Sequence, residues 1–247
     1  MTAQEEFIQY TNKYKKYGEM IDLKTNHTFR VQKLCEELAE SEGLTNEQIE
    51  LASICGLLHD IGRFEQWKRY KSYKDLNTID HGELGVEILK DNYFISKFSP
   101  KNHNIILMSV KYHNKYKVPN NLKEINKYYT NIVRDADKLD ILYLFSINNL
   151  KTKNAETKMS TKIYNTLINK KQIKRVDVKT KADEIAIRLG FIFDLNFKKS
   201  YEIVKENNYI NKVIDNQIIE INNKELINQL EELRIHINNY IEEMISC

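Results

Sequence analysis

An imidazole and a carboxylate stand side by side at His59-Asp60, where the apolar run Leu51–Leu58 gives way to polar residues. Ionisable side chains next to a buried segment are costly unless a partner compensates them. A divalent metal ion suits a neutral imidazole and an ionised carboxylate, because it takes nitrogen and oxygen donors together. A hydrogen-bonded cap at the end of a helix is the alternative interpretation, and the doublet alone leaves both open.

Further possible ligands lie on both sides of this doublet: His27 precedes it, and His81, His113 and Asp137 follow it. Catalytic divalent metals draw such ligands from several elements and keep a position open for water or substrate. Facing helices of a bundle can bring these residues together. Their order does not show that they meet, so unrelated polar positions are the alternative, which for His81 and His113 means isolated histidines at helix ends.

Helices must position these residues, because helical periodicity dominates the chain and strand patterns are scarce. Asn26 can cap a helix that holds His27 in its first turn. Thr45-x-x-Gln48 is a capping box for a helix that leads into the doublet. The other elements expected are a polar and aromatic loop at 63–80, a helix from His81, a helix from Pro100 that ends near His113, and a strongly apolar helix at 128–145 that holds Asp137.

The last hundred residues are helical in pattern but carry no chemical motif. Periodic apolar residues at 182–193 predict one helix, and those at 217–245 predict a long amphipathic closing helix, which packs on the core or, less favoured, forms a homodimer interface. With only two prolines and no linker rich in Gly or Ser, we expect an all-α protein. Residues 1–247 would form a single multi-helix bundle, with a metal-binding core at about 25–145 and a helical C-terminal portion at 150–247.

Composition excludes several classes of protein. A formal net charge of +3 is too near neutral to indicate nucleic-acid binding. Three cysteines, an odd number without C-x-x-C spacing, favour a reducing compartment. The N-terminus lacks a signal-peptide pattern, and no window has the ~20 apolar residues of a membrane span. We therefore expect a cytoplasmic protein that does not enter membranes.

The ordered pattern His27, His59-Asp60 and Asp137 resembles that of the HD-domain metal-dependent phosphohydrolases, which have a His, a His-Asp doublet and a distant Asp. The resemblance is carried by the local sequences at 55–62 and 133–140 and covers about residues 25–145. It implies an HD-type helical bundle and selects Asp137 as the distant ligand. Asp135 lies about 200° from Asp137 around a helix axis, so the two cannot face one metal; Asp135 and Asp140 are then surface, capping or supporting carboxylates.

Some branches of this family add two histidines between the doublet and the last Asp. His81 and His113 look like these additions, which implies a site for two metal ions bridged by Asp60. The implied ligands are His27, His59, Asp60, His81, His113 and Asp137. Ligands of these types suit several divalent ions, so Fe, Mn, Co, Ni, Mg and Zn stay open.

Two ions ~3.5 to 4 Å apart can activate water and neutralise charge on a phosphoryl group. Alongside Asp60 as a catalytic residue, Arg63 is placed to bind the phosphate through its planar guanidinium; a helix C-terminal cation is its equal alternative. Lys111 and Lys115 could add positive charge for substrate binding, although most lysines are simply solvated.

The expected function is metal-dependent hydrolysis of a phosphate ester or anhydride in a small phosphorylated substrate, preferably a nucleotide. Phe64, Trp67, Tyr70 and Tyr73 could stack a nucleobase or simply form a hydrophobic cap. The resemblance leaves one competing enzyme class, the HD-domain di-iron oxygenases, which cleave a C–C or C–P bond with similar ligands. A non-catalytic nucleotide sensor is the third hypothesis.

Overall fold

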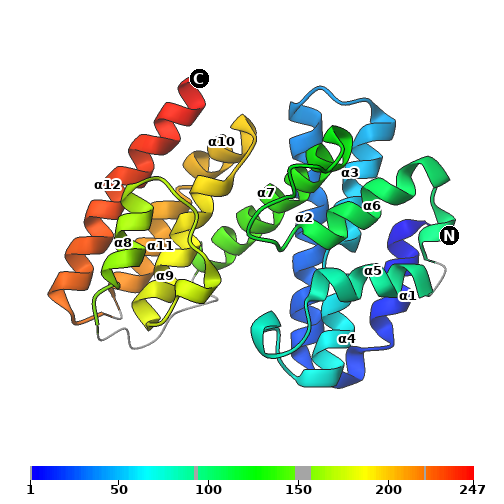
Figure 1. Cartoon of the computed structure of the whole chain (residues 1–247), viewed down its shortest axis with the longest axis horizontal. Coiled ribbons are helices and arrows are strands. Elements are labelled where there is room, and N and C mark those ends of the chain that lie inside the picture. The colour runs from blue at the N-terminus through cyan, green and yellow to red at the C-terminus, as the bar shows by residue number, and fades with distance from the viewer. Residues whose placement is uncertain (1, 92–93, 148–156, 220) are drawn as a thin grey trace. The chain divides into compact units, whose positions relative to one another are not determined.

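The computed structural model describes residues 2–91, 94–147, 157–219 and 221–247 (Figure 1). Within these ranges every regular element is an α-helix or a short 3-10 helix, and no strand occurs. The prediction of an all-α fold is therefore confirmed. None of the described helices is long and apolar enough to cross a lipid bilayer.

The chain divides into two compact units, Met1–Ala136 and Asp137–Cys247, and the division falls inside helix α7. The first unit contains α1 (Ala3–Asn12), η1 (Lys15–Tyr17), α2 (Glu19–Ser41), α3 (Asn46–Leu58), α4 (Ile61–Tyr70), η2 (Asp75–Asn77), α5 (His81–Asp91), η3 (Ile95–Lys97), α6 (Pro100–Tyr112) and the beginning of α7 (Glu124–Ser146). The expectation that residues 1–247 form one domain stays a prediction.

The second unit continues from the end of α7. Its further elements are α8 (Thr161–Ile168), η4 (Arg175–Asp177), α9 (Lys181–Leu189), η5 (Gly190–Asp194), α10 (Lys198–Glu206), α11 (Tyr209–Ile218) and α12 (Lys224–Ser246). Helix α12 begins at Lys224 because the side chain of Asn223 accepts a hydrogen bond from the Leu226 amide and caps the helix. The predicted closing helix at 217–245 is therefore wrong at its start, where residue 217 belongs to α11.

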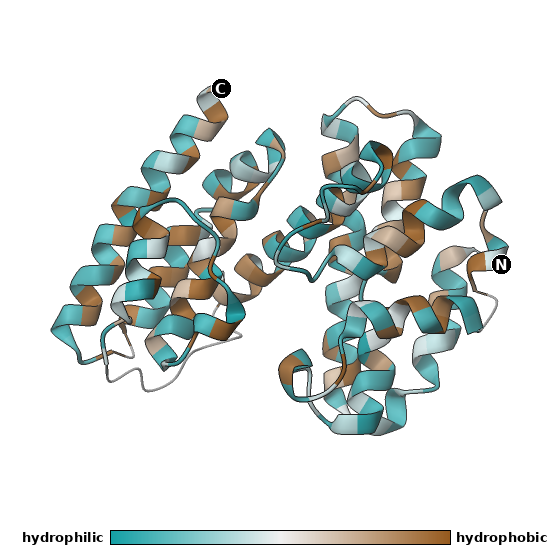
Figure 2. Cartoon of the chain, in the orientation of Figure 1, coloured by the Kyte–Doolittle hydropathy of each residue, from teal (hydrophilic) through white to brown (hydrophobic). Residues whose placement is uncertain are grey.

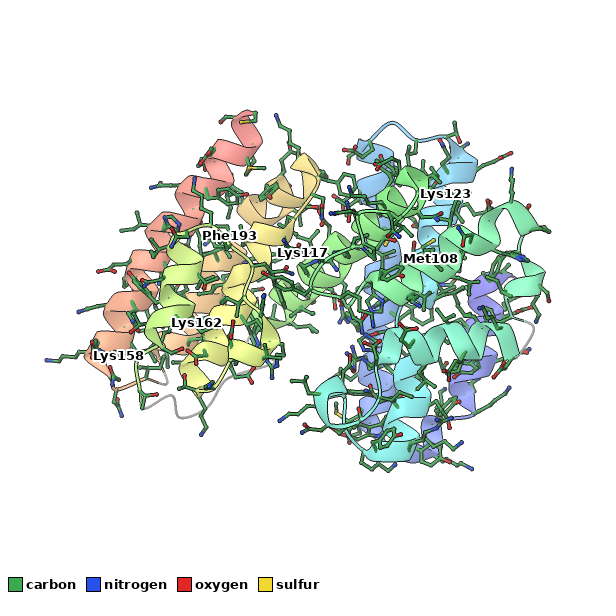
Figure 3. All side chains as sticks on the ribbon, in the orientation of Figure 1. Met108, Lys117, Lys123, Lys158, Lys162 and Phe193 are labelled. Carbon is green, nitrogen blue, oxygen red and sulfur yellow. The ribbon has the colours of Figure 1, made fainter. Side chains whose placement is uncertain are left out.

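Each unit has its own hydrophobic core. In the first, Val31, Cys35 and Leu38 of α2 are fully buried, as are Ala52 and Cys55 of α3. In the second, α12 buries a stripe of apolar residues at helical spacing: Leu226, Leu230, Leu233, Ile237 and Ile241. Figure 2 shows apolar and polar residues on different faces of the helices. Charged side chains such as those of Lys158 and Lys162 project into solvent (Figure 3).

Local signals located four helix boundaries correctly. Thr45 and Gln48 form the predicted capping box before α3. Helix α5 begins at His81, and Pro100 is in the first turn of α6, where its missing N–H costs nothing. Helix α6 ends at Tyr112, so His113 is its C-cap residue as expected.

Two predictions for the first unit are wrong. Helix α2 begins at Glu19 after Gly18, which has a φ of 102°, so Asn26 is not its cap and His27 lies well inside the helix. The helix extends backwards because Ile21 continues its buried apolar face. Residues 63–80 are not one loop either, since they contain most of α4 and the short η2.

Candidate metal centre

Four histidines and one aspartate of the first unit meet in its interior. His27 comes from α2, His59 is the C-cap residue of α3 and Asp60 is the N-cap residue of α4. His81 is the first residue of α5, and His113 follows the last residue of α6. All five residues are at most 4% exposed, so the structure buries an ionisable cluster where apolar contacts would otherwise be expected.

The carboxylate of Asp60 lies between two pairs of histidines. Its Oδ2 atom is 3.5 Å from His27 Nε2 and 3.6 Å from His59 Nε2. Its Oδ1 atom is 3.3 Å from His81 Nε2 and 3.6 Å from His113 Nε2. The donor atoms of His27, His59 and Asp60 lie within 4.8 Å of one another, as do those of Asp60, His81 and His113. Asp60 thus offers one oxygen to each pair.

The other ring nitrogens show which histidine atoms carry lone pairs. His59 Nδ1 is 2.6 Å from the carbonyl oxygen of Gly56, and His113 Nδ1 is 2.8 Å from that of Val110. A carbonyl oxygen only accepts, so each Nδ1 donates its proton. His81 Nδ1 is 2.6 Å from Asp75 Oδ2 and donates to that carboxylate. In the neutral rings, the Nε2 atoms of these three histidines therefore present lone pairs to Asp60.

This arrangement fits a metal ion at each histidine pair. The Nε2 atoms are 3.3 Å apart in the pair His27–His59 and 3.0 Å apart in the pair His81–His113. Two nitrogens each ~2.1 Å from one ion and at right angles to each other are about 3.0 Å apart. Imidazole nitrogens with a carboxylate oxygen are also donors that Fe, Mn, Co, Ni and Zn accept.

Two glycines allow the helices that carry these candidate ligands to approach closely. A Cβ atom on Gly62 of α4 would lie 2.2 Å from the carbonyl oxygen of His81. A Cβ atom on Gly82 of α5 would lie 2.9 Å from the carbonyl oxygens of Val110 and Lys111 in α6. Both distances are shorter than a real contact, so the sequence needs glycine at both positions to bring His81 beside Asp60 and His113.

Lys24 contacts the centre and was missed in the sequence. Its ammonium donates to Asp60 Oδ2 over 2.7 Å, and its side chain is only 17% exposed. Lys24 lies one helical turn before His27 on α2, a spacing that places both on one face of a helix. This spacing is the feature of the sequence that could have identified Lys24 as a residue of the centre.

A second set of residues missed in the sequence holds His81 and Arg63 in place. The Oδ1 atom of Asp75 accepts hydrogen bonds from Arg63 Nη1 over 2.8 Å and from Gln66 over 2.9 Å, while its Oδ2 atom binds His81. Gln66 is fully buried and also donates to Thr78 Oγ1 and to the backbone carbonyl of Ile79. Carboxylates behind a ligating histidine fix its tautomer and orientation.

Burial and charge set the protonation states in the centre. Burial opposes the ionisation of Asp60, but the Lys24 ammonium and the surrounding imidazoles outweigh it, so the pKa of this carboxyl lies well below its ordinary value. Burial and the Arg63 guanidinium lower the pKa of His81 to about 4, against the opposing effect of Asp75. At neutral pH, Asp60 is therefore an anion and His81 a neutral imidazole.

The three predicted substrate-binding cations have different surroundings. Arg63 lies at the centre, with its Nε atom 3.5 Å from Asp60 Oδ1. Lys111 forms an ion pair with Glu83 at 3.2 Å. Lys115 pairs with Asp80 and, at 3.8 Å, with Glu83. Both lysines thus bind carboxylates of α5 or of the residue before it, and their contact with a substrate stays a prediction.

Asp137 is in α7 and is the first residue of the second unit. It is half-buried and belongs to neither of the two ligand groups found among the described residues, so its role as a ligand stays a prediction. Asp135 and Asp140 are 0% and 1% exposed, so the surface location considered for them is wrong. Ile132, Val133 and Leu139 of the same helix are buried as well.

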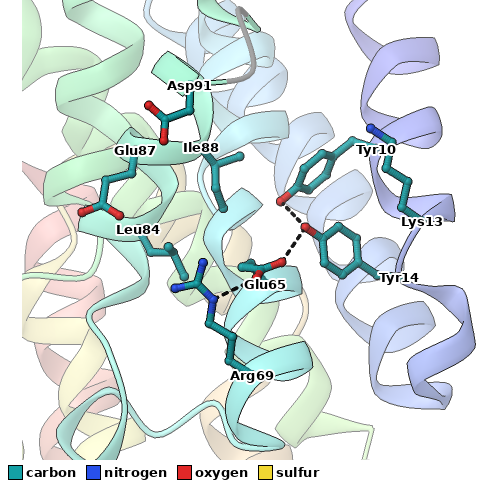
Figure 4. Close-up of a pocket in the computed structure, with 9 residues that line it drawn as sticks. All are labelled: Tyr10, Lys13, Tyr14, Glu65, Arg69, Leu84, Glu87, Ile88 and Asp91. Atoms are coloured by element: carbon teal, nitrogen blue, oxygen red, sulfur yellow. Dashed lines mark hydrogen bonds and ion pairs between the residues drawn. The ribbon is translucent and has the colours of Figure 1, made fainter.

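A separate pocket of about 280 Å³ lies between α1, α4 and α5 (Figure 4). None of the candidate metal ligands lines it. Tyr14 and Arg69 both bind Glu65 there, over 2.9 and 2.8 Å. Because these polar groups satisfy one another, we assign no chemistry to this pocket.

Comparison with known proteins gives one match. Residues 25–142 match the profile of the protein family described as HD domain, and this match covers all but the last three residues of the predicted core at 25–145. No curated protein and no solved structure matched the chain. The matched segment contains His27, His59-Asp60, His81 and His113 as well as Asp137. Residues 25–142 of this chain thus form a domain of the HD-domain family.

Proposed function

We propose that this protein hydrolyses a phosphate ester or anhydride, with a nucleotide as the preferred substrate class, at a site for two divalent metal ions. One observation carries the proposal: the two oxygens of Asp60 face two different histidine pairs. A carboxylate that served one ion, or only capped a helix, would not need a pair of imidazoles at each oxygen.

The proposed ligands form two sets that share Asp60. His27, His59 and Asp60 Oδ2 would hold one ion, and Asp60 Oδ1, His81 and His113 the other. Asp137 is proposed as a further ligand because the order His27, His59-Asp60 and Asp137 resembles the pattern of the family. When bound, two divalent ions lower the pKa of a water molecule and neutralise charge on a phosphoryl group.

The residues around the ligands support a role with an anionic substrate. Arg63 is held at the centre because its Nη1 atom donates to Gln66, to the backbone carbonyl of Tyr73 and to Asp75, over 2.7, 2.7 and 2.8 Å. A guanidinium fixed in this way is suited to binding phosphate oxygens.

The support for a nucleotide comes from Tyr73, which lies beside Arg63, and from Trp67, which lies beside Tyr73. The ring of Tyr73 lies 5.7 Å from the Arg63 guanidinium carbon and 4.9 Å from the ring of Trp67. Aromatic rings next to a phosphate-binding group can stack a nucleobase. This is the finer part of the proposal, and the phosphohydrolase activity does not depend on it.

The test combines elemental analysis with a substrate panel. Protein purified without oxygen should contain about two divalent ions per chain and should hydrolyse members of a panel of phosphate monoesters, diesters and nucleotides. Iron-containing protein that consumes O2 and is inert toward every phosphate ester would instead support the oxygenase hypothesis. Tight nucleotide binding without turnover in any divalent metal would support the sensor hypothesis.

A further inference from the structure

Lys24 is placed to bind more than Asp60. Its ammonium lies 2.7 Å from Asp60 Oδ2 and 5.6 Å from the centre of the Tyr73 ring. An ammonium has three N–H donors. In the part of the chain that the structure describes, Asp60 is the one hydrogen-bond acceptor of Lys24, so two of its donors are left for a ligand.

Arg63 has spare donors at the other oxygen of the same carboxylate. Its Nη1 atom already serves three acceptors, whereas no acceptor among the described residues faces Nη2. Its Nε atom is buried without a hydrogen bond, 3.5 Å from Asp60 Oδ1. Lys24 and Arg63 therefore approach Asp60 from its two oxygens, and the Tyr73 ring lies beside both cations.

The charge of the centre argues for an anion at these donors. Without ions, Lys24 neutralises Asp60, and this is the simplest account of the pair. With two divalent ions on Asp60, however, the carboxylate is more than neutralised, and two further cations in a largely buried site repel the ions and each other. A bound anion removes this repulsion, because the ions and both side chains can share its charge.

We propose that Lys24 and Arg63 together bind the terminal phosphoryl group of the substrate, which makes a phosphate monoester dianion the preferred substrate class. This inference rests on the proposed phosphohydrolase function. A monoester presents three peripheral oxygens and two negative charges, whereas a diester presents two such oxygens and one charge. Four cationic groups, two metal ions and two side chains, match the monoester better. In this scheme Lys24 is a substrate-binding residue and not a metal ligand.

The experiment measures inorganic phosphate binding and metal content in the same preparations of full-length protein. Lys24→Met should keep the metal content of the wild type and bind phosphate about 10- to 100-fold more weakly, the effect expected for lost hydrogen bonds to a charged group. Lys24→Arg, which keeps the charge, should bind phosphate more tightly than Lys24→Met. Lys33→Met is the matched control, because Lys33 is exposed on the same helix α2, and it should bind phosphate like the wild type.

Activity assays add the preference between substrates. Lys24→Met should lower kcat/KM for an aryl phosphate monoester more than for the matching diester. Thermal denaturation monitors folding, and Lys24→Gln carries the same expectations if Lys24→Met does not fold.

Three results would overturn the inference: phosphate binding unchanged in Lys24→Met, equal weakening in Lys24→Met and Lys24→Arg, or loss of metal in Lys24→Met. The last would make Lys24 a residue that supports the metal centre. The proposed function fails separately, through wild-type protein that holds no divalent ion. Phosphate binding to the wild type and to Lys24→Met still decides the role of Lys24 in that event.

Discussion

The two oxygens of Asp60 face two different histidine pairs. This arrangement predicts how many metal ions the protein retains when one of these histidines is replaced. His113→Ala removes one of the three donors in the set of Asp60 Oδ1, His81 and His113, and leaves His81 Nε2 as the remaining nitrogen there. The set of His27, His59 and Asp60 Oδ2 is untouched. We therefore expect His113→Ala to retain about one ion per chain where the wild type retains two. His27→Ala should also retain about one ion, held by the set of Asp60 Oδ1, His81 and His113.

The size of the effect follows from the role of the lost atom. Residues that only orient a metal ligand contribute about 10- to 100-fold to metal affinity. Removal of a ligand itself should cost at least about 100-fold, or about 2.8 kcal/mol. A loss of this size empties one position during gel filtration in metal-free buffer, while the other position keeps its three donors.

Elemental analysis after anaerobic purification measures the stoichiometry. His103→Ala is the matched control, because His103 lies on α6, whose C-cap residue is His113, but binds the carbonyl oxygen of Phe98 and belongs to neither ligand set. The double variant His27→Ala with His113→Ala should retain almost no metal. Two retained ions in His113→Ala would refute the reasoning, because His113 would then not be a metal ligand. No retained ion would also refute it, because the two metal positions would then depend on each other.

Three further predictions concern the residues that support the centre. Gly62→Ala should lower the free energy of unfolding by about 1 to 3 kcal/mol in chemical denaturation, because its Cβ would lie 2.2 Å from the carbonyl oxygen of His81. Unchanged stability would contradict the close approach of α4 and α5. Asp75→Asn should weaken binding of one of the two ions by about 10- to 100-fold in metal titrations, because the carboxylate orients His81, and equal weakening of both ions would contradict the assignment. In metal-free protein, folding lowers the pKa of His81 from 6.5 to about 4, so the unfolded chain binds more protons than the folded chain between these two pH values. The free energy of unfolding should therefore fall, by up to about 3 kcal/mol, as the pH falls from 6.5 to about 4. Denaturation of wild type and His81→Gln at several pH values measures this slope, and an equal slope in both proteins would refute it.

Helices whose ends carry local signals were predictable from the sequence. The signals for these ends lie within one helical turn: the capping box of Thr45 and Gln48 before α3, the proline at residue 100 in α6, and the residues at the start of α5. Such contacts depend on neighbours in the sequence, so the residue types are sufficient to indicate them.

Helix α4 was not predicted from the sequence because its buried face includes a polar side chain. Gln66 is fully buried, but its partners Asp75, Thr78 and Ile79 come from the segment after the helix. A glutamine at a core position breaks the apolar period, so the pattern resembles a loop. Only the folded segment shows that its hydrogen bonds are satisfied.

The sequence by itself determined which donors this protein has and in what order: His27, His59-Asp60, His81, His113 and Asp137. Helical periodicity was enough to predict the all-α fold, because it is a local property. The HD-type core and the set of nitrogen and oxygen ligands were implied by the resemblance of this order of residues to a known family. Only the tertiary structure decided that each oxygen of Asp60 faces its own histidine pair and that Lys24 reaches the same carboxylate. Those contacts depend on how closely the helices pack, which Gly62 and Gly82 permit but which no pattern along the chain specifies.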